Sequence, residues 1–81
     1  MSPAPPFTAK QGQCLAFVYA YSRIFRQPPA EIDMRRRFQV SPPSARQMAL
    51  ALDRAGLIRR TPGVARSIEL LVDPKDLPVL R

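Results

Sequence analysis

One stretch with a marked start and a marked stop, Ser41 to Ile58, constrains the fold more than any other part of the chain. Ser41 suits a helix N-cap, because its hydroxyl accepts a hydrogen bond from a free amide of the first turn. Pro42 follows at the first helical position, where a missing N–H is no loss. Gly56 marks the stop, since glycine readily takes the left-handed conformation that closes many helices. The sequence therefore predicts a helix over about residues 42–55.

This central helix is predicted to have two chemically different faces. Small and apolar residues recur at helical spacing on a face suited to pack on a core: Ala45, Met48, Ala49, Leu52 and Ala55. The opposite side carries Pro43, Arg46, Gln47 and Arg54. Guanidinium and amide groups near a helix N-terminus are the groups that read base edges in the DNA major groove. A solvated surface helix has the same composition, so this helix alone leaves both interpretations open.

A longer helix is predicted upstream, over about residues 9–25. Thr8 suits its N-cap, and Gln11, three positions later, is the expected capping-box partner. The Pro-Pro pair at 28–29 removes backbone donors and ends the helix. A wide apolar face at helical spacing is expected to enter the core: Cys14, Leu15, Phe17, Val18, Tyr21, Ile24 and Phe25.

A short helix over about residues 29–37 is predicted between these two. Its charges match the helix dipole, with acidic residues first and basic residues last: Glu31 and Asp33, then Arg35, Arg36 and Arg37. Its expected core contacts are Ile32, Met34 and Phe38. Residues 39–40 form a short turn into the central helix. A helix, a short turn and a capped basic helix is the order of a helix-turn-helix.

After Gly56, two partly alternating segments, residues 57–60 and 66–72, surround a Pro-Gly turn. This pattern is typical of a two-stranded antiparallel hairpin. An isolated hairpin is marginal in water, so we expect it to lie against the helices. A hairpin placed beside a recognition helix is a wing that can follow the DNA backbone, and this one carries Arg59, Arg60 and Arg66.

The chain is expected to hold one domain, residues 8–72, between a proline-rich arm of residues 1–7 and a tail of residues 73–81. Phe7 is the expected anchor of the arm on the first helix. Two prolines make the tail irregular. The tail is nevertheless apolar, and we expect it to dock on the domain or on a partner, with Leu50 available to cover it; its apolar residues are Leu77, Val79 and Leu80.

The charge of the chain is concentrated in its middle. The net charge is +7, and residues 23–66 hold ten arginines against three acidic residues. A basic segment of this kind favours a polyanionic partner, most often nucleic acid. The eleven arginines far outnumber the two lysines, which suits bidentate contacts to phosphate or guanine.

The residue types present exclude several other functions. With no histidine and a single cysteine, Cys14, the chain has neither an internal disulfide nor the usual ligands of zinc. It also lacks clustered carboxylates and a phosphate-cradling glycine loop, so we expect no catalytic residues, no cofactor and no metal. No secretory leader or bilayer-spanning segment is apparent. We therefore expect a cytoplasmic, nucleoid-associated protein without membrane contact.

Several different short motifs follow one another along residues 8–71, and their order and spacing together form a recognisable pattern. They are Thr-Ala-Lys-Gln (8–11), Pro-Pro-Ala-Glu-Ile (28–32), Ser-Pro (41–42), Ala-Leu (51–52), Arg-Ala-Gly-Leu-Ile (54–58), and Gly63 with Arg66 and Ile68. In this order the chain resembles the N-terminal DNA-binding domain of LexA-type repressors. The resemblance implies a mostly helical α+β fold, a winged helix-turn-helix with three helices and a two-stranded wing.

The resemblance also implies a DNA-binding site. In that family, residues just after the cap of the recognition helix read the bases, which implies Ser44, Ala45, Arg46 and Gln47 as base-reading residues. The expected contacts to the DNA backbone are Ser41, Arg59, Arg60 and Arg66, followed by Lys10, Arg35, Arg36 and Arg37. Pro43 replaces a polar residue of those repressors, and the pair at 46–47 replaces an acidic pair, so a different operator is implied. The sequence lacks their self-cleaving peptidase domain, and we expect no autoproteolysis.

The expected function is sequence-specific binding of double-stranded DNA by a small stand-alone transcription regulator of bacterial type. Pairing on a repeated site is expected through the tail or through Leu50. Three alternatives remain open: a winged helix that binds an acidic protein, an accessory DNA-binding protein of a mobile element, and RNA binding.

Overall fold

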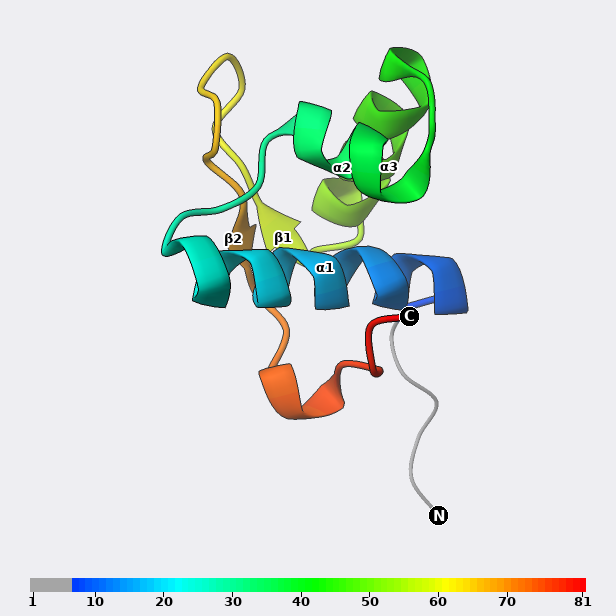
Figure 1. Ribbon diagram of the computed structural model, residues 1–81, viewed down its shortest axis with the longest axis vertical. Helices are drawn as coiled ribbons and strands as arrows, with labels where there is room; N and C mark the ends of the chain where they lie inside the picture. Colours follow the sequence, from blue (N-terminus) through cyan, green and yellow to red (C-terminus); the bar gives the residue numbers. More distant parts are fainter. Residues whose placement is uncertain (1–6) are drawn as a thin grey trace.

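Three helices and a short hairpin follow one another in the order of a winged helix-turn-helix, as predicted (Figure 1). The computed structural model describes residues 7–81. The helices are α1 (Ala9–Phe25), α2 (Glu31–Phe38) and α3 (Pro42–Arg54); the strands are β1 (Ile58–Arg59) and β2 (Glu69–Leu70); and a 3₁₀ turn, η1, spans Pro74–Asp76. The predicted arm lies outside the described residues except for Phe7, which packs against the core.

Helix α1 begins and ends where the sequence predicts. The Thr8 hydroxyl accepts from the Gln11 amide at 3.1 Å, and the Gln11 side chain accepts from the Thr8 amide at 3.0 Å. Figure 1 shows α1 crossing the molecule, with α2 and α3 on one side and the C-terminal segment on the other. Its middle turns are therefore covered from both sides, and Leu15 and Val18 are fully buried.

The last turn of α1 departs from the predicted apolar face. Ile24 is 71% exposed and Phe25 is 57% exposed. This turn extends past the elements that cover the middle of the helix (Figure 1). Tyr21 is half-buried and packs edge-on against Phe17, with ring centroids 5.7 Å apart. The prediction of Ile24 and Phe25 as core residues was wrong because no neighbouring element reaches the end of the helix.

Helices α2 and α3 form the helix-turn-helix. Helix α2 begins two residues later than predicted, at Glu31, and Met34 is its buried anchor. The prediction of Ile32 as a core contact was wrong, since it is 44% exposed. Helix α3 begins at Pro42 as predicted, with the Ser41 hydroxyl accepting from the Ser44 amide. After α3, Gly56 adopts a φ of 75°, the left-handed conformation expected of the stop.

The hairpin is shorter than predicted. Strand β1 pairs with β2 in antiparallel register, Ile58 opposite Leu70 and Arg59 opposite Glu69. Beyond these pairs the two segments no longer pair through their backbones. The Ser67 hydroxyl instead accepts from the Thr61 amide at 2.9 Å and donates to the Thr61 carbonyl at 3.2 Å. Positive φ angles at residues 63 and 66 complete the turn back.

The tail is folded onto α1. The Gln13 side chain donates to the Val79 carbonyl and accepts from the Arg81 amide, both at 2.9 Å. Leu77 and Leu80 pack against the core, so docking on the domain is the alternative that the structure supports. The tail lies on the opposite side of α1 from α3, the helix that contains Leu50 (Figure 1). Leu77 and Leu80 are therefore not a free surface for a second copy.

Candidate nucleic-acid interface

The outer face of α3 presents polar side chains without intramolecular partners. Arg46 and Gln47 follow the Ser41 cap by about one turn and are both exposed. Neither side chain forms a hydrogen bond or an ion pair with any other residue in the described range 7–81. Because Ala49 and Leu52 fix the opposite face in the core, the helix is held rigidly while these two side chains stay available.

The backbone at the start of α3 has few free amides that could bind an anion. Pro42 and Pro43 have no N–H, the Ser44 amide bonds to the Ser41 hydroxyl at 3.3 Å, and the Ala45 amide bonds to the Ser41 carbonyl at 2.9 Å. The Ser41 hydroxyl also donates to the Ser44 hydroxyl at 3.0 Å. The Ser41 hydroxyl thus serves as the cap, and its predicted contact to the DNA backbone stays a prediction. The Ser44 hydroxyl keeps its own proton for an outside acceptor.

Ala45 was wrongly predicted to read bases. Its exposed fraction is 0%, and it lies on the core face of α3 with Ala49 and Leu52. The helical spacing already placed Ala45 on that face, and the family resemblance wrongly carried it over to the reading face. A buried methyl group cannot reach a base edge.

Arg66 is a clamp within the domain rather than a free cation. One nitrogen, Nη1, donates to the Tyr21 hydroxyl at 3.0 Å, to an Asp33 carboxylate oxygen at 3.1 Å and to the Pro28 carbonyl at 3.2 Å. The Tyr21 hydrogen bond is the main cause that raises the pKa of the Arg66 guanidinium. These contacts hold the wing loop against α1 and α2. The prediction of Arg66 as a contact to the DNA backbone stays a prediction, because 36% of its side chain remains exposed.

Arg60 is also engaged inside the domain. Its Nη1 lies 3.9 Å from Glu31 Oε1 and its Nε lies 3.7 Å from Asp53 Oδ2. Only 20% of its side chain is exposed, so it bridges α2, α3 and the wing and is not free to grip phosphate. Arg59 differs, because its side chain is 69% exposed and meets only Glu69 across the hairpin, at 3.4 Å.

The remaining cations predicted to contact the DNA backbone differ in their exposure to solvent. Lys10 and Arg36 are exposed, whereas Arg35 and Arg37 are half-buried. The Arg37 guanidinium lies over the Phe38 ring, 5.6 Å from its centroid. Lys10, Arg36 and Arg59 are therefore the predicted backbone contacts that the fold leaves accessible.

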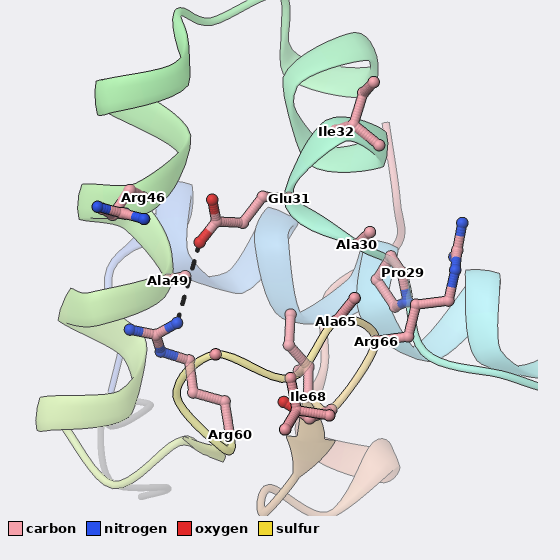
Figure 2. A pocket seen from close by; sticks show the side chains of 13 residues that line it. Pro29, Ala30, Glu31, Ile32, Arg46, Ala49, Arg60, Ala65, Arg66 and Ile68 are labelled. Carbon is pink, nitrogen blue, oxygen red and sulfur yellow. Dashed lines mark ion pairs between the residues drawn. The ribbon is translucent and has the colours of Figure 1, made fainter.

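Two grooves flank α3. The first, here called the wing groove, has a volume of about 340 Å³ and lies between α2, α3 and the wing loop; Glu31, Arg46 and Arg60 line it (Figure 2). The second, here called the helix groove, has a volume of about 470 Å³ and lies between the start of α1 and α3; Lys10, Gln47 and Met48 line it. The two base-reading candidates thus open onto different grooves.

Sequence reasoning missed the carboxylates that hold the wing. Glu31 and Asp33 were assigned only to the helix dipole, and Asp53 was given no role. Asp33 additionally accepts from the Ala30 amide at 2.8 Å, and its position as the third residue of α2 was a readable capping signal. The pairings with Arg60 and Arg66 join distant segments, for which the sequence carries no local signal.

No protein-family model matches this sequence, and no curated protein is similar to it. Among residues 7–81, no three side chains of the His, Cys, Asp and Glu types are grouped so as to hold a metal ion. In the same described range, none of the helices has the length and apolarity needed to cross a membrane.

Proposed function

We propose that this protein binds double-stranded DNA in a sequence-specific manner, as a small transcription regulator of bacterial type related to the LexA-type DNA-binding domain. Helix α3 enters the major groove and the wing follows the backbone. One observation carries the proposal: α3 is capped and buried along one face, while Arg46 and Gln47 stand unpaired on the other within the described chain.

The chemistry of these two residues suits base edges. An arginine donates two parallel hydrogen bonds to O6 and N7 of guanine, whereas a glutamine donates to N7 of adenine and accepts from its N6 amino group. Each such pair contributes roughly 1–3 kcal/mol of discrimination against a wrong base. We assign the guanine contact to Arg46 and the second base to Gln47, with Ser44 as an additional donor.

The accessible cations supply the part of the affinity that does not depend on sequence. Lys10, Arg36, Arg54 and Arg59 are exposed, and contacts of this type to phosphate release counterions and weaken with salt. Arg60 and Arg66 contribute by holding the wing in place. Association with the nucleoid follows from the same proposal.

One observation favours a second candidate, a module that binds an acidic protein. The exposed Ile24 and Phe25 at the end of α1 are flanked by the exposed Arg23 and Arg26. An apolar patch with a basic rim suits an acidic amphipathic partner. This patch is separate from the reading face of α3, so substitutions distinguish the two functions.

The test is a selection from a random duplex library, followed by titration of the winning duplex against a scrambled one over a salt series. We expect specific binding to exceed non-specific binding by ~10³ or more at physiological salt. R46A should lose roughly 1–3 kcal/mol and relax one base position. R81A removes the same charge from the tail and is the matched control.

Two results would overturn the proposal. The first is a selection that enriches no site and leaves only steeply salt-dependent binding, since that is the electrostatic term alone. The second is an equal loss in R46A and R81A with no change in base preference.

A further inference from the structure

The helix groove has an apolar floor that the proposed contacts to DNA do not use. Cys14 and Leu52 are buried beneath it, and Val40 and Met48 form more of its lining. Its volume of about 470 Å³ lies within the range of small-molecule sites, roughly 300–1,000 Å³. An apolar concavity of this size favours a ligand with an apolar body.

The rim of the helix groove is positive. Lys10 is the only charged residue among those that line it, and no carboxylate is among them. Its ammonium forms no ion pair with any other described residue. The first turn of α1 also contains no acidic residue, in contrast to α2, so no carboxylate of that turn offsets the charge of Lys10. The rim therefore favours an anionic group.

The charge of Lys10 acts on the Cys14 thiol at the floor of the groove. Burial raises the pKa of the Cys14 thiol to about 11, and Lys10 acts against this rise by favouring the thiolate. Lys10 and Cys14 both line this groove of about 470 Å³, so one small molecule can contact the cationic group and the apolar floor.

We infer that the helix groove binds a small amphipathic monocarboxylate, with its alkyl or aryl body on the floor and its carboxylate against Lys10. The Gln47 amide, which also lines the groove, is a second donor to the carboxylate. A duplex phosphate would satisfy Lys10 but would leave the floor around Met48 uncovered. A neutral apolar ligand would cover the floor but would not use the positive rim.

The position of the groove makes its ligand a regulator of DNA binding, and this step rests on the proposed function. Ser44 and Gln47 line the groove, so a ligand seated there occupies the donors that read DNA. Ligand and DNA are then competitors, and by linkage each lowers the affinity for the other by the same factor.

The test uses the full chain without DNA, labelled with ¹⁵N and titrated with sodium octanoate. From the size of the ligand and the openness of the site we expect a dissociation constant on the order of 1 mM. Saturable amide shifts should concentrate at Lys10, Cys14, Gln47 and Met48. Octylammonium chloride, which has the same chain and the opposite charge, should bind at least ~10-fold more weakly, because the rim repels it.

Substitutions at exposed alanines locate the site without disturbing the core. Ala51 is exposed and lines the groove, whereas Ala55 is exposed at the end of α3 and does not. A51F fills the groove and should weaken octanoate binding at least ~10-fold, while A55F should not. Both variants are checked by their amide spectra. Equal binding of octanoate and octylammonium, or equal effects of A51F and A55F, would overturn the inference.

A competition experiment separates this inference from the proposed function. Octanoate should displace the selected duplex from the wild-type chain and should be at least ~10-fold less effective against A51F. Intact DNA binding without saturable octanoate binding overturns the inference that the helix groove binds a monocarboxylate and leaves the proposed function standing. Saturable octanoate binding without DNA binding overturns the proposed function and leaves the ligand site standing. If octanoate and DNA both bind but do not compete, only the regulation of DNA binding by the ligand is overturned.

Discussion

Replacing Arg60 should weaken the proposed DNA binding, even though Arg60 is assigned to holding the wing and not to a contact with DNA. Its guanidinium lies 3.9 Å from the Glu31 carboxylate, and Arg46 lies beside the same carboxylate in the wing groove (Figure 2). In R60Q, Glu31 loses its present cation. Arg66 also lines this groove but is held by Asp33, so Arg46 is the cation left to pair with Glu31.

The expected size of this effect is modest. The Glu31 side chain is 40% exposed, so solvent screens the new pair, and such pairs typically contribute about 0.2–1 kcal/mol. Arg46 must break this pair before it contacts a base. The dissociation constant for the selected duplex should therefore rise by a factor of about 1.4 to 5, with the loss concentrated at the base that Arg46 reads.

The assay is a fluorescence anisotropy titration at fixed salt, with circular dichroism to confirm that each variant is folded. Two double variants separate the capture of Arg46 from the loss of a positive charge. E31Q/R60Q and D53N/R60Q have the same net charge, but only the first removes the carboxylate that captures Arg46. We expect E31Q/R60Q to recover wild-type affinity and D53N/R60Q to stay weak. Equal recovery in both would refute the reasoning, because net charge would then explain the loss.

Three further predictions concern the stability and reactivity of the domain. R66A should lower the midpoint of urea unfolding, because it leaves the Asp33 carboxylate, 16% exposed, without its cation; an unchanged midpoint would contradict the role of Arg66 in holding the wing loop. G12A should destabilise the domain by roughly 1–3 kcal/mol on thermal unfolding, since its methyl group would meet the Pro78 ring at 3.1 Å; faster proteolysis of the tail should accompany it, and a rise in the melting temperature would show that helix propensity outweighs the clash. The Cys14 thiol has a pKa raised to about 11, so it should react slowly with iodoacetamide at pH 8, and rapid labelling of the folded protein at that pH would argue against burial. The same shift means that the protonated thiol stabilises the folded state below pH 9, and that this contribution is lost as the pH rises through about 11.

The features that could be predicted from the sequence are those set by neighbours along the chain. Thr8 with Gln11 and Ser41 with Pro42 place two helix starts correctly, because a cap bonds to residues within one turn. Gly56 likewise places the end of the central helix correctly, because the conformation that closes a helix depends on the residue at that position. The order of the elements then follows from the short turns between them, which is why the winged helix-turn-helix could be predicted at all.

The features that could not be predicted depend on what packs against a residue from elsewhere in the chain. Ile24 and Phe25 match the apolar period of α1 as well as Leu15 does, yet only the middle of the helix is covered. Gln13 gave no sign that it would hold the tail, from which it is separated by 66 residues at Val79. Periodicity shows which face of a helix is apolar, but not how far along the helix that face is covered.

The arginines divide into two groups for the same reason, and the division bears on the proposed interface. All three acidic residues between positions 23 and 66, Glu31, Asp33 and Asp53, lie against an arginine of the wing. The pairs with Arg60 and Arg66 therefore set the position of the hairpin relative to α2 and α3. Arg46 has no such partner among the described residues, although Glu31 lies in the same groove. The fold thus pairs these three carboxylates with Arg60 and Arg66, and in the proposed interface this arrangement leaves Arg46 free to contact a base.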